Sequence, residues 1–347
     1  MNTPASTATH RLASAEGERG LIDLIRRRLP PAPADLLVGP GDDAAVVRPD
    51  RGAFQILTTD AVVEGVHFDL RSSSPADAGH KALAANLSDI ASMGGAPRFA
   101  LLSLMLPDAC TLETVDQLLD GFLDLAERAR VTVAGGNISR SPGPLIIDVA
   151  LTGSVRPRKV LTRGGGRAGD RLYVSGSIGA AAAGLAWLKA QGSGTYRERP
   201  TDPGLGECVD RHRRPEPRIR LGTIAGRTRA ASACLDLSDG LADAVRQMAE
   251  ASGTGAKVDA GRLPIQPAAV EWFRSTGADP VLRALQGGDD YELLLAVPAR
   301  AKGRFRALTR LAGGLALTHI GELTKESSLA LVRDGVEEAL PEGFAHF

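Results

Sequence analysis

Residues Val38 to Val46 read Val-Gly-Pro-Gly-Asp-Asp-Ala-Ala-Val. The glycines and the proline predict a tight turn, and the apolar residues after it have strand character. Two adjacent carboxylates in such a turn repel each other and suit a divalent cation such as Mg²⁺, which prefers hard oxygen ligands and bridges to substrate phosphates. When it stands alone, such a short stretch is more often a solvated surface turn, so the rest of the chain decides between the two roles.

Further aspartates occur in the same kind of setting. Most follow an expected strand or lie in a glycine turn, beside serine, threonine or glycine rather than among other charges. We expect them to share one cleft, where bound Mg²⁺ would offset the cost of burying carboxylates. Helix caps and turns explain one or two members, but so many caps of one kind would be unusual. The set comprises Asp42, Asp43, Asp60, Asp89, Asp236, Asp239, Asp289 and Asp290.

In the first half of the chain, the expected helices and strands do not alternate regularly. Apolar residues at helical spacing predict helices over 21–29, 75–93 and 112–129, and apolar runs predict strands over 54–58, 99–106, 131–134 and 145–155. This order favours an α+β or mixed sheet.

The second half alternates strand and helix. Strands are expected over 171–174, 233–237 and 291–297, helices over 178–190, 241–251 and 302–311, and a loop over 192–206. The fold class is therefore a mixed α/β architecture in two parts. We expect a flexible tail over 1–15, an N-terminal domain over 16–155 and a C-terminal domain over 156–347.

Composition excludes several classes of function. Lys plus Arg equal Asp plus Glu at 41 each, and aromatic residues are only 4%, so general nucleic-acid binding has no support. The apolar runs are too short to span a membrane. Cys110, Cys208 and Cys234 show neither metal-ligand spacing nor a disulfide framework, and no signal peptide is evident, which favours the cytoplasm.

Two glycine-rich segments fit nucleotide motifs only in part. Residues 164–169 have P-loop glycine spacing, but Asp170 and Arg171 follow where Lys and Ser/Thr would bind phosphate and metal. The first turn loosely fits a dinucleotide pattern, but its carboxylates would repel a pyrophosphate without metal. Arg163 is a better phosphate candidate, and the arginines of 211–220 are more typical of a solvated basic face. From the residues alone we expect an enzyme that uses several Mg²⁺ ions on a phosphate substrate.

Seven motifs occur in a fixed order. They are Gly-Asp-Asp-Ala-Ala at 41–45, Thr-Thr-Asp at 58–60, Gly-Val-His-Phe at 65–68, Lys-Ala-Leu-Ala-Ala-Asn-Leu-Ser-Asp-Ile-Ala-Ser-Met-Gly at 81–94, Leu-Thr-Arg at 161–163, Asp-Leu-Ser-Asp-Gly-Leu at 236–241 and Gly-Gly-Asp-Asp-Tyr-Glu-Leu at 287–293. From Gly39 onward the chain resembles the thiamine-monophosphate kinase family. The motif at 81–94 resembles a wider superfamily that includes aminoimidazole ribonucleotide synthetase.

The resemblance implies two α/β domains, with the N-terminal sheets of two chains paired across a homodimer. It also implies a transferase that moves the γ-phosphoryl group of ATP to thiamine phosphate, with several Mg²⁺ ions as cofactors. Phosphoryl transfer needs mainly positioning and charge compensation, and the acceptor phosphate is already ionised, so we expect no catalytic base.

The resemblance also implies roles for individual residues. ATP-binding positions are Gly135, Gly136, Arg163 and Ser238, and substrate-binding positions are His67, Asp289 and Phe344. Metal ligands are expected at Asp42, Asp43, Thr58, Thr59, Asp60, Asp89, Asn137, Asp236 and Asp239.

The chain departs from the family pattern at three of these positions. Asn137 stands where relatives often have Asp, Asp289 where Glu is frequent, and Phe344 where a larger or hydroxylated aromatic is usual. Two alternatives stay open. One is another ATP-dependent enzyme of the superfamily, of the aminoimidazole ribonucleotide synthetase type. The other, which Asn137 keeps open, is a sensor that binds nucleotide or thiamine phosphate without catalysis.

Overall fold

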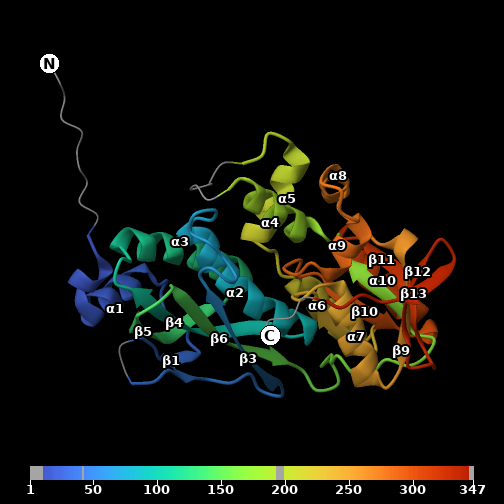
Figure 1. Ribbon diagram of the computed structural model, residues 1–347. Coiled ribbons are helices and arrows are strands. Elements are labelled where there is room, and N and C mark those ends of the chain that lie inside the picture. The colour runs from blue at the N-terminus through green and yellow to red at the C-terminus, as the bar shows by residue number, and fades with distance from the viewer. Residues whose placement is uncertain (1–10, 41–42, 193–198, 344–347) are drawn as a thin grey trace.

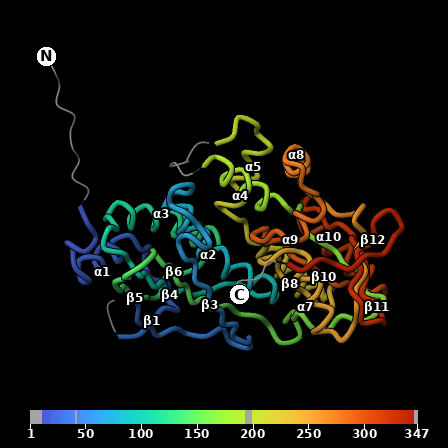
Figure 2. The backbone as a smooth tube through the Cα atoms, viewed as in Figure 1, coloured from blue at the N-terminus to red at the C-terminus, as the bar shows by residue number. Residues whose placement is uncertain are grey.

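The computed structural model describes residues 11–40, 43–192 and 199–343, which form two sheets with their covering helices (Figures 1 and 2). The first sheet has the order β3-β6-β4-β5. Its strands are β3 (Phe54–Val63), β4 (Ala96–Pro107), β5 (Thr132–Ser141) and β6 (Ile146–Val155), and only the β4–β5 pair is parallel.

One face of this sheet is covered by α2 (Pro75–Ser92) and α3 (Leu112–Ala129). The two-residue alternation of β6 shows which face is inside: Ile147, Val149 and Leu151 are buried in the core, and the residues between them are only half-buried. On the opposite face, Leu57 and Leu101 are 72% and 43% exposed.

The remaining N-terminal elements lie on the β4–β5 side of this sheet. They are a 3-10 helix (Ala13–Ala15), α1 (Gly17–Arg28), β1 (Leu36–Val38) and β2 (Val46–Val47), and β1 pairs with β2. Ala13 is buried, and its backbone N–H donates to Cys110 O at 2.8 Å, so the end of the expected tail packs against the body.

The second sheet has seven strands in the order β13-β12-β9-β11-β7-β10-β8. Its strands are β7 (Arg171–Ser175), β8 (Ala233–Asp236), β9 (Gly255–Asp259), β10 (Leu293–Val297), β11 (Leu317–Thr324), β12 (Leu329–Arg333) and β13 (Val336–Ala339). Only the β9–β12 pair is parallel.

Both faces of this sheet are covered by helices. Residues of α7 (Leu241–Ser252) and α9 (Pro280–Gln286) pack on one face, and those of α6 (Ile219–Thr228) and α10 (Lys302–Leu311) on the other. A smaller apolar cluster joins α4 (Ala180–Ala190), α5 (Pro203–Arg213) and α8 (Pro267–Ser275). Short 3-10 turns occupy Ala260–Arg262 and Ala299–Ala301.

Helix α2 connects the two halves, because it contacts α3 on one side and α6 and β8 on the other. It begins with a capping box, in which Ser74 and Asp77 each accept a backbone hydrogen bond from the other. Gly79 and the alanines of α2 have small side chains, so neighbouring helices can approach its backbone. A Cβ atom at Gly222 of α6 would lie 1.9 Å from Ala91 O of α2, so these helices pack with their backbones close together.

The mixed α/β fold class is confirmed, and α3 has the predicted bounds. Two local predictions were wrong. Residues 192–206 are not all loop, since α5 begins at Pro203 after the N-cap Asp202, and β5 continues through Gly135 and Gly136 to Ser141. Among the described residues no helix is long and apolar enough to cross a membrane.

We predict that Gly121→Ala destabilises the fold, because a Cβ atom there would lie 1.8 Å from Ala76 O at the α2–α3 contact. The expected loss is about 1–3 kcal/mol of unfolding free energy, measured by urea denaturation. Gly143→Ala is the matched control, since a Cβ at Gly143 meets no atom within 4 Å. Equal stability of the two variants would contradict the close helix contact.

Candidate active site

A cleft of about 940 Å³ lies between the two halves of the molecule. One wall comes from the end of β3, the loop to His67 and α2. The other comes from α4, α8 and α9, from the residues after β8, and from the loop before β10. The cleft therefore lies where α2 meets the second sheet.

Four carboxylates lie close together in this cleft, and we call them the acidic cluster: Asp60, Asp89, Asp236 and Asp239. Asp60 is on β3, Asp89 on α2, Asp236 at the end of β8, and Asp239 in the turn before α7. Hydrogen bonds tie the cluster to its supports, since Ser88 Oγ donates to Asp236 Oδ2 at 2.8 Å and the Thr58 hydroxyl donates to Asp89.

The electrostatics of the acidic cluster are unfavourable by themselves. Burial, followed by the charges of Asp89, Asp236 and Asp239, raises the pKa of Asp60 to about 7. Burial and then Asp89 raise the pKa of Asp236 to about 7, although the Ser88 hydrogen bond opposes this shift. Such shifts are typical of functional sites, where a bound cation removes the repulsion.

The chemistry of the acidic cluster fits Mg²⁺ better than a transition metal. Its members offer only oxygen atoms. Among the described residues, no group of three or more His, Cys, Asp or Glu side chains is arranged so that it could hold a metal ion by itself. Mg²⁺ keeps several waters and is usually bound through one or two carboxylates together with substrate phosphates. The residues thus fit a magnesium ion that arrives with a phosphate ligand.

The loop Gly287–Glu292 forms the wall facing α2. Asp289 lines the cleft, and its Oδ2 accepts a hydrogen bond from Lys81 Nζ at 2.8 Å. Burial would raise the pKa of Asp289, but the charge of Lys81 and a contact with His212 hold it well below its usual range. Asp289 and Tyr291 have positive φ angles of 67° and 48°, which is uncommon for residues with a side chain.

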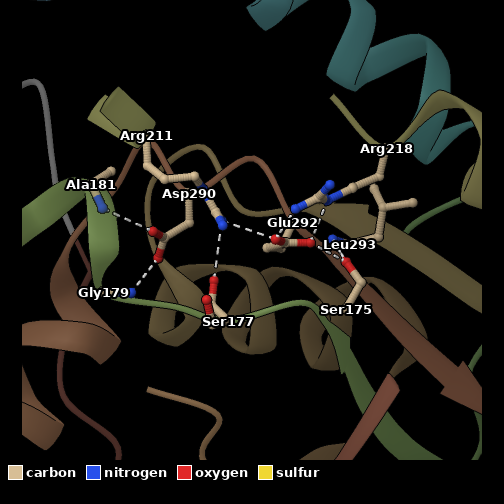
Figure 3. A network of polar contacts seen from close by, with 9 residues as sticks. All are labelled: Ser175, Ser177, Gly179, Ala181, Arg211, Arg218, Asp290, Glu292 and Leu293. Carbon is tan, nitrogen blue, oxygen red and sulfur yellow. Dashed lines mark hydrogen bonds and ion pairs between the residues drawn. The ribbon is translucent and has the colours of Figure 1, made fainter. Parts of the chain in front are cut away.

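The next two acidic residues of this loop, Asp290 and Glu292, do not line the cleft and instead bind neighbouring groups of the protein (Figure 3). Asp290 Oδ2 accepts from Gly179 N at 2.7 Å and Asp290 Oδ1 from Ala181 N at 3.3 Å, at the start of α4. Burial raises the pKa of Asp290 to about 7 despite these bonds. This end of α4 is thereby fixed to the loop.

Glu292 is completely buried, and it binds two arginines. Its carboxylate accepts from Arg211 Nη2 at 2.9 Å, from Arg218 Nε at 2.7 Å and from Ser175 Oγ at 2.5 Å. The prediction of a solvated basic face over 211–220 was therefore wrong for Arg211 and Arg218. These arginines balance a buried charge behind the loop that carries Asp289.

Comparisons with known proteins agree along most of the chain. The AIR synthase related protein family is matched in its N-terminal domain by residues 41–155 and in its C-terminal domain by residues 167–334. The thiamine-monophosphate kinase of Escherichia coli (strain K12) is 37% identical over 336 residues, which cover 95% of this chain and 98% of that protein.

The chain belongs to the thiamine-monophosphate kinase family.

Two solved structures support this assignment. The thiamine-monophosphate kinase from Stenotrophomonas maltophilia K279a is 35% identical with a TM-score of 0.80, and 91% of this chain and 96% of that chain are covered. AaThiL complexed with AMPPCP and TMP is 33% identical with a TM-score of 0.74, and 98% of this chain and 100% of that chain are covered.

The structure places many of the residues expected from the kinase family in the cleft. Asp60, His67, Asp89, Asp236, Ser238, Asp239 and Asp289 line it. Thr58 supports it through its hydrogen bond to Asp89. Asp42 and Phe344 lie outside the described residues.

The other expected site residues do not line the cleft. Thr59 Oγ1 donates to Asp148 Oδ1 at 3.2 Å, and Asn137 pairs with Ser103 in the same sheet. Gly135 and Gly136 lie within β5, Arg163 is exposed and donates to Gln247, and Asp43 is exposed before β2.

Sequence reasoning gave no role to several residues around the site. Lys81 and Glu292 stand inside motifs that were noticed, but neither motif shows which partner its charge meets. His212 and Trp272 line the cleft from α5 and α8, which were not predicted as helices. A prediction of α5 and α8 as helices would have been needed to place these two side chains near the site.

We predict that Glu292→Gln lowers the free energy of unfolding by about 3–5 kcal/mol, because it removes the fully buried charge that pairs with two partly buried arginines. The control is Glu216→Gln, which weakens an exposed pair with Arg128 and should cost about 1 kcal/mol or less. Urea denaturation of both variants measures the difference. Similar small losses would mean that the Glu292 contacts do not support the loop.

Proposed function

We propose that this protein transfers the γ-phosphoryl group of ATP to thiamine phosphate and releases thiamine diphosphate and ADP. One observation carries the proposal: a chain that aligns with thiamine-monophosphate kinases over 95% of its length has an acidic cluster in a cleft of about 940 Å³. AaThiL, a structural neighbour, binds AMPPCP, an ATP analogue, together with TMP. The proposed enzyme is therefore an ATP-dependent phosphotransferase with a phosphate group as acceptor.

The acidic cluster would bind the cations that the proposed reaction needs. Donor and acceptor are both anionic, so their approach is costly unless positive charge lies between them. We infer that Asp60, Asp89, Asp236 and Asp239 would hold several Mg²⁺ ions. Bound Mg²⁺ would neutralise the phosphates and stabilise charge in the transition state. The carboxylates themselves then act as ligands rather than as proton acceptors.

Two other residues of the cleft, Asp289 and His67, suit the thiamine portion of the acceptor. Asp289 lines the cleft and stays ionised at neutral pH in its pair with Lys81, so its carboxylate can accept hydrogen bonds from the acceptor. His67 lines the same cleft, and its Nδ1 accepts from Val63 N at 3.1 Å, which orients the ring. We assign both residues to acceptor binding, with Phe344 as a third contact. Ser238 and Arg163, with Gly135 and Gly136, are assigned to ATP.

We also propose a homodimer that covers the outer face of the first sheet. Leu57 is 72% exposed there, and Leu101 is 43% exposed on β4. Thr59 and Asn137 lie in this sheet but outside the cleft, so their expected role as metal ligands depends on what a second copy brings to this face. Cys110, Cys208 and Cys234 are buried free thiols, which supports the proposed cytoplasmic location.

The activity test uses purified protein, ATP, Mg²⁺ and thiamine phosphate, with thiamine diphosphate measured by chromatography. We expect product only with Mg²⁺, and a fall in kcat of about a hundredfold or more in Asp239→Ala and Asp60→Asn, because each removes a charged ligand from the acidic cluster. Asp116→Asn is the control, since Asp116 is half-exposed and pairs with Arg28 on α1.

Each contrary result of this test has its own meaning. Binding of both ligands without product would favour the sensor. Product from aminoimidazole ribonucleotide precursors instead of thiamine phosphate would favour a synthetase. Equal rates in all variants would contradict the assignment of the acidic cluster as metal ligands.

For the dimer, we predict that Leu57→Lys shifts the protein from twice the chain mass to the chain mass in size-exclusion chromatography with light scattering. A lysine on a covered apolar face costs more than a surface lysine because its charge loses water. Val336→Lys is the control, since Val336 is 68% exposed on the edge strand β13. A wild-type protein that is monomeric at micromolar concentration would refute this interface.

A further inference from the structure

Lys81 is a charged side chain in a place that normally excludes charge. It lies on α2 with only 2% of its surface exposed. Burial of an ammonium group is costly unless the group is paired and hydrogen-bonded. Lys81 Nζ donates to Asp289 Oδ2 at 2.8 Å and to His67 O at 2.8 Å. The two contacts explain how this position tolerates a lysine.

Both partners of Lys81 line the cleft, although Lys81 does not. His67 belongs to the loop after β3, in the first half of the molecule. Asp289 belongs to the loop before β10, in the second half, and has a φ angle of 67°. A single ammonium group therefore connects two cleft residues that come from different halves. Neither residue lies within a helix or a strand that would hold it in place.

His212 is a second basic side chain in contact with Asp289, with its Nδ1 3.4 Å from Asp289 Oδ2. Burial and then the charge of Lys81 lower the pKa of His212, so this ring is neutral at pH 7. Lys81 is consequently the group that supplies positive charge to Asp289. A neutral residue at position 81 would change both the charge and the position of this carboxylate.

We propose that Lys81 is a positioning residue for the acceptor substrate, which holds Asp289 and His67 at a fixed separation across the cleft. This inference rests on the proposed function, because it assigns these two residues to thiamine phosphate. It goes beyond that function in giving a role to a residue that touches neither substrate. Lys81 acts through its two partners, so its loss affects binding of the acceptor and leaves binding of ATP intact.

The test is steady-state kinetics on Lys81→Met, which keeps an unbranched apolar side chain of similar length but removes the charge. We expect the KM for thiamine phosphate to rise about ten- to a hundredfold, as for loss of one charged hydrogen bond, while the KM for ATP changes less than about twofold. Lys81→Arg restores the charge and should show a smaller rise. If Lys81→Met does not fold, Lys81→Gln replaces it in the same measurements.

The matched control is Lys159→Met. Lys159 Nζ also donates to a backbone carbonyl, Arg227 O at 2.7 Å, but its side chain is exposed and does not line the cleft. Both KM values should be unchanged in this variant. Equal rises in both KM values of Lys81→Met, or none, would overturn the proposal, because a purely structural role moves them together.

A double-mutant cycle with Asp289→Asn distinguishes a role of Lys81 through Asp289 from a general loss of structure. If Lys81 acts through Asp289, the KM of the double variant for thiamine phosphate should be far below the product of the two single effects. Multiplicative effects would overturn the proposal. Calorimetry of the wild-type protein with thiamine phosphate distinguishes the two failures: no binding to wild type refutes the proposed function, whereas equal binding to wild type and Lys81→Met refutes only the role of Lys81.

Discussion

The close approach of α2 to its neighbours is the constraint on which the rest of the structure depends. A Cβ atom at Gly79 of α2 would lie 2.1 Å from Leu118 O of α3, so glycine is required where these helices meet. Because the backbones are this close, the short side chains of α2 reach both halves of the molecule. Ser88 touches Asp236 of the second sheet, and Asp89 accepts from Thr58 of the first. Bulkier residues on α2 would move the aspartates of the first half, Asp60 and Asp89, away from those of the second half, Asp236 and Asp239.

The same helix carries two residues of opposite charge that serve different parts of the site. Asp89 belongs to the acidic cluster, where the raised pKa values report carboxylates that repel one another. Lys81, two turns earlier, balances Asp289 at the other wall. The acidic cluster thus needs added cations, whereas Asp289 already has a positively charged partner in the protein. This asymmetry suits a ligand whose phosphate end comes with metal ions and whose other end does not.

Local sequence patterns predicted those elements whose apolar residues repeat strongly. Helix α3 was found to the residue because Val115, Leu119, Phe122 and Ala126 recur on one face. The strands β9 and β11–β13 were not predicted, and the partners of β9 lie far away in the sequence, so no local pattern reports their pairing. Helix α5 was missed although Asp202 and Pro203 form a good start signal, because few apolar residues follow them.

For the site, residue types and spacing predicted which carboxylates are functional candidates, but not which of them lie close together. That Asp60, Asp89, Asp236 and Asp239 meet depends on how α2 packs between the sheets, which no single motif contains. Thr59 and Asn137 were expected with them, yet they lie outside the cleft, because successive residues of a strand point to opposite faces.

The segment Gly287–Glu292 shows how a short motif can serve packing and chemistry at once. Asp290 and Glu292 are tied into the protein behind it, by backbone N–H groups of the α4 start and by two arginines. These bonds offset the cost of positive φ angles at Asp289 and Tyr291. Asp289 is thereby presented to the cleft in a conformation that an unsupported loop would rarely adopt. The buried acids of this motif thus have a structural role, and the one at the surface of the cleft is left for the ligand.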